Sequence, residues 1–138
     1  MSEDPKPRSK LLHYGLWIVQ LLLAFSFIAA GGMKLAMPLE ELAANGIALA
    51  GRAPFWFVKF TGFVEVLGGV GLILPAALRI LPVLTPAAAI GLVVTMIAAA
   101  GEHAMNAEFG PIVAPVILGL MAAFVAWGRL MGAPIASR

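Results

Sequence analysis

The 138-residue sequence contains no cysteine, and charged residues make up only 12% of it. The missing thiols exclude disulfides, thiol catalysis and thiolate metal ligation. The scarcity of charge excludes an ordinary soluble domain, which is about a quarter charged and about half apolar. The formal net charge of +2 is also too small to indicate a nucleic-acid partner.

Apolar residues dominate what is present: they form 62% of the chain, and the mean hydropathy is +0.99. A soluble fold of this length would lack the polar residues needed to cover its surface. A helix that crosses a membrane needs about 20 mainly apolar residues. Four such runs follow one another, at about 11–36, 54–74, 86–105 and 111–128. They predict an all-α integral membrane protein, a four-helix bundle in contact with the lipid bilayer, with 1–138 as one domain.

Prolines and a threonine set the expected helix boundaries. We expect the second helix to end before Pro75, because proline in a helix interior removes a hydrogen bond. Thr85 is expected to cap the third helix, with Pro86 at its first position. Between the first two spans, apolar residues of segment 39–50 recur at helical spacing opposite polar ones, which predicts a short interfacial helix.

The distribution of basic residues predicts the orientation of the chain. Basic residues near the ends of membrane helices favour the cytoplasmic side. They occur in the N-terminal tail (1–10), in the second connection and in the C-terminal tail: Lys6, Arg8, Lys10, Arg79, Arg129 and Arg138. The other two connections contain Arg52 and most of the acidic residues: Glu40, Glu41, Glu102 and Glu108. Both termini are therefore expected to be cytoplasmic.

Glu65 is the most informative polar residue within a span. It lies about eleven residues into the second helix, near the middle of the membrane. Charged residues at this depth are costly and usually face a protein interior or a cavity. The carboxyl group either exchanges protons or binds a ligand, or it joins helices as a neutral or lysine-paired acid. Lys34 is the candidate partner: by helix rise it differs from Glu65 by about 10 Å in depth, so the two side chains meet only if the helices are offset.

Lys34, Lys59 and His103 all belong to the outer half of the predicted bundle. Together with Glu65 they form our candidate ligand or proton site, because convergent polar groups in an apolar cleft orient a ligand. The alternative is that the lysines snorkel to the headgroups and that His103 is merely solvated. We expect no metal site, because metals need three or four convergent ligands and no HxxxH or ExxH pair is present.

Two glycines near the end of the fourth span, Gly128 and Gly132, have the GxxxG spacing. This spacing lets two membrane helices approach closely. A homo-oligomer is therefore a candidate assembly.

Several short motifs occur in a fixed order along three of the four helices. They are GMKL at 32–35, GRAPF at 51–55, EVLGGVGL at 65–72, and Pro86-Ala87-Ala88 followed by Met96, Ala99 or Ala100, and His103. With these motifs in this order, the sequence resembles the DoxX-like family of small bacterial four-span membrane proteins. The family's usual arginine early in the first helix is not evident, and His13 occupies roughly that place.

The resemblance implies a multi-pass protein of the bacterial cytoplasmic (inner) membrane. Some members of the family are subunits of oxidoreductases that pass electrons from sulfur compounds to quinone, and others are linked to oxidative-stress complexes. It therefore implies an accessory membrane subunit of an oxidoreductase or redox-stress assembly, with a redox enzyme as partner and a site for a quinone or another small molecule. We expect no other cofactor, and whether the chain is itself an enzyme stays open.

The sequence leaves two further functions open. The chain has no cysteine, haem-ligand pair or nucleotide motif, so we do not expect it to carry redox chemistry alone. One alternative is a non-catalytic membrane scaffold that stabilises a partner. The other is a small proton-coupled transporter, for which four packed helices would need to oligomerise.

Overall fold

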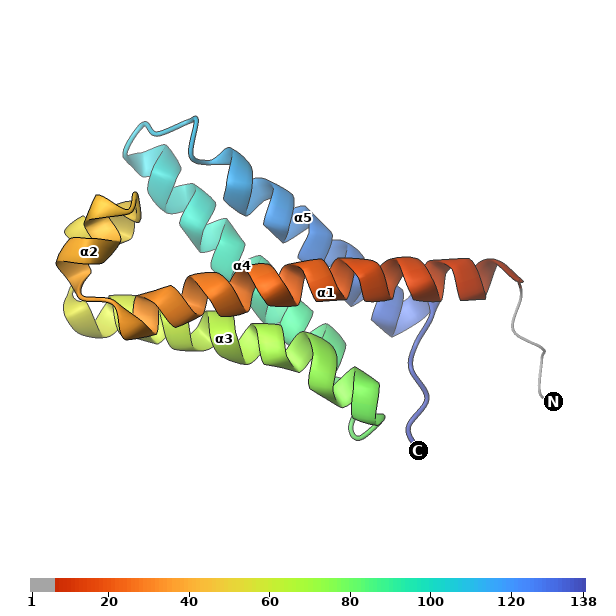
Figure 1. Ribbon diagram of the computed structural model, residues 1–138. Helices are drawn as coiled ribbons and strands as arrows, with labels where there is room; N and C mark the ends of the chain where they lie inside the picture. Colours follow the sequence, from red (N-terminus) through yellow and green to blue (C-terminus); the bar gives the residue numbers. More distant parts are fainter. Residues whose placement is uncertain (1–6) are drawn as a thin grey trace.

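Four long helices and several short turns form the part of the chain that the structure, a computed structural model, describes: residues 7–138 (Figure 1). In chain order the elements are α1 (Pro7–Ala36), α2 (Leu39–Ala44), the 3₁₀ turn η1 (Ala48–Gly51), α3 (Phe55–Leu78), α4 (Leu84–Met105), α5 (Val113–Trp127) and the π-helical turn η2 (Gly128–Gly132). No strand occurs within this range. The predicted all-α fold, with a short helix between the first and second spans, is confirmed.

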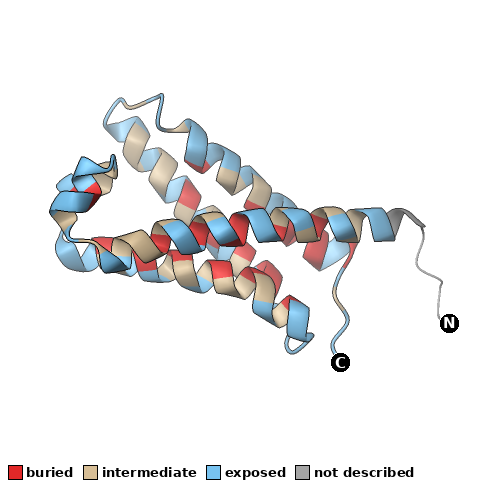
Figure 2. Ribbon diagram, in the orientation of Figure 1, coloured by how far each residue is buried: buried red, intermediate tan, exposed pale blue. Residues whose placement is uncertain are grey.

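The outer surface of the bundle is apolar, as expected for helices in lipid. Four stretches within residues 7–138 are long and apolar enough to cross a membrane: Lys10–Ala36, Phe55–Leu78, Leu84–Met105 and Val113–Gly132. Large apolar side chains on these helices face outward; Phe25, for example, is 77% exposed and Leu120 67%. Buried positions instead concentrate on the sides where helices meet (Figure 2). The chain is therefore a multi-pass membrane protein.

The helices pack as two pairs, α1 with α3 and α4 with α5, and α3 also packs on α4 (Figure 1). A core of fully buried side chains joins the pairs, including Leu16, Leu23, Phe27, Leu72 and Leu92. The start of α1 and the C-terminus lie at one end of the bundle, and α2 with η1 covers the other end. Which end faces the cytoplasm stays a prediction, and Lys6 of the basic tail lies outside the described residues.

Close packing of α1 on α3 depends on two glycines. A Cβ atom added at Gly31 would lie 2.5 Å from the carbonyl oxygen of Gly62, and one added at Gly62 would lie 2.7 Å from Cβ of Lys34. Real side chains do not tolerate such distances, so only glycine permits this approach. Lys34 and Glu65 each follow one of these glycines by three residues, nearly one helical turn.

The boundary between α3 and α4 differs from the sequence prediction. Pro75 lies inside α3, which continues to Leu78. Proline cannot donate to the carbonyl oxygen of Gly71, four residues earlier, and the hydroxyl group of Thr85 donates to that oxygen instead, at 3.0 Å. Helix α4 begins at Leu84 and its N-cap is Val83, so Thr85 lies inside the helix and does not cap it.

The two ends of the chain also differ from expectation. Helix α1 begins at Pro7 rather than near residue 11, because proline is favoured in a first helical turn. At the other end, the GxxxG pair is used within the chain. Gly128 packs against the side chain of Leu16, and Gly132 packs against that of Leu12. The structure thus gives this spacing contacts within the chain, and the homo-oligomer stays a prediction.

Candidate functional site

A cavity of about 370 Å³ opens between α1, α3 and α4, beneath the α2–η1 segment. Its walls are mainly apolar, with Ala30, Phe57 and Ala98 among them. The polar side chains that line it include Lys34, Glu65, Thr61, Thr95, Glu102 and His103. We call this space the Glu65 cavity. Its volume lies within the range of about 300–1,000 Å³ that is typical of small-molecule sites.

Lys34 and Glu65 form a buried ion pair in the wall of the Glu65 cavity. Nζ of Lys34 donates to Oε1 of Glu65 at 2.6 Å, and the two side chains are 14% and 5% exposed. The glycine contact between α1 and α3 supplies the close approach that the pair needs. The second carboxylate oxygen, Oε2, is buried and has no hydrogen-bond partner within residues 7–138. The pair thus leaves one strong acceptor unsatisfied beside the cavity.

Lys59, the second candidate lysine, has a different position. It is absent from the lining of the Glu65 cavity. Its ammonium group donates to the carbonyl oxygens of Lys34 and Met37, each at 2.6 Å. A cation bonded to the last carbonyl groups of a helix stabilises that helix end. Lys59 therefore fixes the end of α1 and, with it, the position of Lys34.

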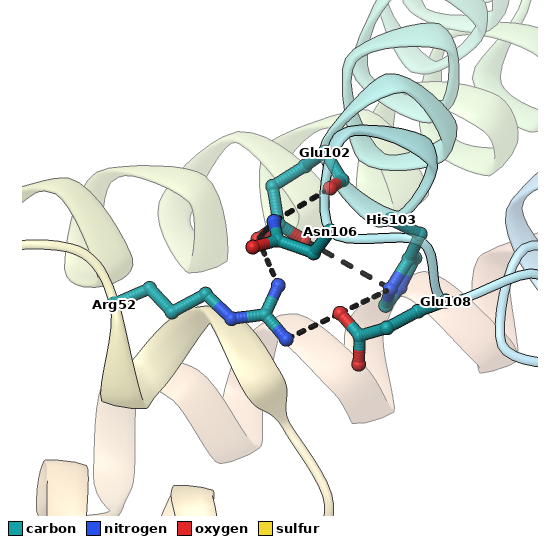
Figure 3. A network of polar contacts seen from close by, with 5 residues as sticks. All are labelled: Arg52, Glu102, His103, Asn106 and Glu108. Atoms are coloured by element: carbon teal, nitrogen blue, oxygen red, sulfur yellow. Dashed lines mark hydrogen bonds and ion pairs between the residues drawn. The ribbon is translucent and has the colours of Figure 1, made fainter.

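His103 lies at the mouth of the Glu65 cavity, beside two acidic residues (Figure 3). Its Nδ1 atom lies 3.9 Å from a carboxylate oxygen of Glu102 and 3.7 Å from one of Glu108. Glu108 reaches this position because Ala107 adopts a left-handed conformation, and the backbone N–H of Glu108 donates to the carbonyl oxygen of His103. This is the Schellman arrangement that ends many helices.

Arg52 joins this cluster from the segment between η1 and α3 (Figure 3). Its guanidinium group binds Oε1 of Glu102 at 2.5 Å and also binds Oε1 of Glu108. We call this set the Arg52 bridge. The hydrogen bond from Arg52 lowers the pKa of Glu108, and the two carboxylates raise the pKa of Arg52. The bridge connects the segment that covers the cavity to the end of α4.

The cluster at the mouth also bears on the expectation that no metal site is present. Ligand atoms of Glu102, His103 and Glu108 lie within 4.8 Å of one another, a convergence that sequence spacing does not reveal. These are residue types that bind divalent metals. However, the guanidinium group of Arg52 already binds both carboxylates. It supplies positive charge where a metal would, so the described contacts form an ion-pair network, and the absence of a metal stays a prediction.

A second buried polar cluster, at the opposite end of the bundle, was missed by the sequence argument. Arg129 on η2 is only 4% exposed, and its guanidinium group donates to Oε1 of Gln20 at 2.7 Å and to the carbonyl oxygen of Ala133 at 2.9 Å. It also lies 2.9 Å from Nδ1 of His13. Gln20 in turn donates to the carbonyl oxygen of Leu72 at 2.6 Å. An amide side chain in the middle of the first apolar run is the signal that could have revealed this cluster.

The two clusters have different chemical capacities. Polar atoms of the Arg129 cluster are bonded to one another and tie α1, α3 and η2 together. The Glu65 cavity instead offers an unsatisfied carboxylate oxygen and a lysine ammonium group within an apolar enclosure. Such a site can hold a lipophilic molecule by its polar head group.

The fold and the cavity define a small multi-pass membrane protein with a polar site inside a four-helix bundle. The sequence model of the DoxX-like family matches residues 18–125, and the chain belongs to this family. Comparisons with curated proteins and with solved structures gave no match. The matched range includes Lys34, Glu65 and His103.

Proposed function

We propose that this protein is an accessory membrane subunit of an oxidoreductase or redox-stress assembly, and that it binds a quinone-type lipophilic molecule in the Glu65 cavity. The observation that carries the proposal is the pairing of an apolar cavity with the Lys34–Glu65 ion pair. A ring with an alkyl tail suits the apolar walls, and polar ring substituents suit the two charged groups. Membership of the DoxX-like family supports a role beside a redox enzyme.

The bonding of Lys34 supports a role in holding a ligand oxygen. An ammonium group has three donors, and the structure gives Lys34 one side-chain hydrogen bond, to Glu65. The remaining donors are available to an oxygen atom of a ligand. The low exposure of Lys34, 14%, strengthens such a bond because little water competes for it.

Filling the cavity tests the binding role directly. Ala98 lines the cavity, whereas Ala29 on α1 lies outside it, and both residues are exposed. We expect wild-type protein and Ala29→Trp, each in mild detergent, to bind decylubiquinone in a titration. Ala98→Trp should weaken this binding by about tenfold or more, equivalent to about 1.4 kcal/mol. Absence of wild-type binding, or equal binding by Ala98→Trp, would overturn the proposal.

The subunit role needs a separate experiment. We expect the tagged protein, extracted in mild detergent, to retain a redox enzyme whose quinone-dependent turnover falls when Ala98→Trp replaces the wild type. A partner that is retained with unchanged turnover would identify a non-catalytic scaffold instead. Recovery of the protein without any redox enzyme would contradict the subunit role.

A further inference from the structure

We propose that the Glu65 cavity selects a ligand whose head group carries a hydroxyl, so that it takes a hydroquinone or related phenol in preference to the corresponding quinone. This inference rests on the proposed function, because it assumes that the cavity holds a lipophilic molecule. It adds the chemical feature that the site recognises. The observation behind this feature is the unbonded atom Oε2 of Glu65.

Oε2 of Glu65 is an acceptor for which residues 7–138 supply no donor. The side chain is 5% exposed, and its other oxygen, Oε1, binds Lys34. Oε2 itself is buried and unbonded within residues 7–138. Buried polar atoms are nearly always satisfied, and leaving one unpaired is costly, more so for a charged group. Glu65 lines the cavity, so a ligand donor that bonds Oε2 once the carboxylate turns toward the cavity relieves this cost.

The nearby hydroxyl groups are already engaged elsewhere. Thr61 donates to the carbonyl oxygen of Val58, and Thr95 donates to that of Gly91, both at 2.8 Å. The hydroxyl hydrogen is the single donor that a threonine side chain has. Neither residue can satisfy Glu65 without giving up a bond within its own helix. An occupant of the cavity can supply the donor that Oε2 lacks among residues 7–138.

Lys34 completes the preference for a hydroxyl group. A hydroxyl oxygen accepts from the ammonium group of Lys34 while its hydrogen is donated to Oε2 of Glu65. A quinone carbonyl accepts from Lys34 but offers no hydrogen, and Oε2 stays unpaired. Hydrogen bonds to charged groups are about twice as strong as neutral ones, so the difference between the two ligands is large.

A matched set of three ligands tests the preference. We expect wild-type protein, titrated anaerobically in mild detergent, to bind decylubiquinol about ten- to a hundredfold more tightly than decylubiquinone. The dimethyl ether of the same hydroquinone keeps the ring and the tail but lacks the hydroxyl hydrogens. It should bind no more tightly than the quinone, and this comparison needs no mutant.

A carboxylate replacement assigns the effect to Glu65. Glu65→Gln should bring hydroquinone and quinone to within about threefold of each other, because its amide group both donates and accepts. Glu40→Gln is the matched control: Glu40 is exposed on α2, so the wild-type preference should persist. A preference that persists in Glu65→Gln would overturn the inference.

The outcomes separate this inference from the proposed function. If wild-type protein binds none of the three ligands, the proposed function itself fails. If it binds all three equally, the cavity binds lipophiles but the hydroxyl selection is wrong. Tighter binding of the quinone would mean that Glu65 is neutral and donates, which also overturns the inference.

Discussion

Glu65 lies at a depth where a solitary carboxylate would be strongly disfavoured, and the structure compensates it through contacts made by a second helix. Lys34 supplies the positive charge at 2.6 Å, and Lys59 holds the end of α1 from which Lys34 extends. Lys34 thus binds the carboxylate directly, whereas Lys59 binds the backbone that positions Lys34. This division of roles explains why two cations lie so close to one buried acid.

The ion pair predicts a specific pattern of stabilities. Lys34→Met should lower the free energy of unfolding by about 3–5 kcal/mol, because it leaves a buried carboxylate without its partner. The double variant Lys34→Met/Glu65→Gln should recover part of that loss, since no charge is left behind. Thermal unfolding in detergent measures both. Lys10→Met combined with Glu65→Gln is the control and should be additive, because Lys10 is exposed near the other end of α1. Additive losses for Lys34 and Glu65 would contradict the pairing.

The Arg52 bridge predicts a dependence of stability on pH. Arg52 holds the pKa of Glu108 below its usual value of 4.5, so the folded state binds a proton less readily than the unfolded state. The stabilisation is therefore present above about pH 4.5 and is lost as the pH falls through the lowered pKa. In melts at decreasing pH, Glu108→Gln should show a shallower acid limb than wild type. Identical acid limbs would show that the bridge does not contribute to stability, and Glu40→Gln serves as the exposed control.

At the scale of single helices, the sequence predicts the number and the approximate limits of the spans because hydrocarbon thickness sets the length of an apolar helix. It fails at the end of α3, where Pro75 continues the helix. The rule that proline ends a helix assumes that the freed carbonyl oxygen has no other donor. Here Thr85, ten residues later in the chain, supplies that donor to Gly71. A tertiary contact of this kind has no local signature.

The contact between Thr85 and Gly71 can be tested with a double-mutant cycle. Thr85 is fully buried, so Thr85→Val keeps the shape but leaves the carbonyl oxygen of Gly71 unpaired. We expect a loss of about 1–2 kcal/mol in wild-type background. In a Pro75→Ala background the restored backbone N–H can satisfy that oxygen, and the loss from Thr85→Val should shrink. An equal loss in both backgrounds, measured by thermal unfolding, would refute this account of the proline.

At the scale of the whole molecule, the residues of the candidate site could be predicted from the free-energy cost of placing charge in a membrane span. The contacts between these residues could not be predicted. Glu65 and Lys34 stand out because charge within an apolar run is unusual. Their contact depends on the close packing of α1 and α3 at two glycines. The Arg52 bridge depends on the turn after α4, which places Glu108 beside His103. The buried Arg129 cluster joins residues more than 100 positions apart: Gln20 in the first apolar run indicates a buried polar contact, but nothing along the chain indicates that Arg129 is its partner.

The predicted orientation of the bundle can be tested by labelling, because the chain has no native cysteine. Cysteines introduced at Ser2 and Arg138 should resist an impermeant thiol reagent in intact cells, whereas one at Glu108 should react. This follows from the excess of basic residues at the end where the termini lie. Labelling at both termini but not at position 108 would reverse the orientation.

The measurement that tests the central claim most directly is photolabelling of the Glu65 cavity. The probe is an alkyl hydroquinone with a diazirine group near its ring, applied to purified protein and followed by peptide mass spectrometry. The account predicts adducts on the less exposed cavity walls, at Ala30 and Ala99, that disappear with excess unlabelled hydroquinone. Adducts confined to the lipid-facing surface, such as Phe25 and Leu120, and unaffected by competitor would contradict it.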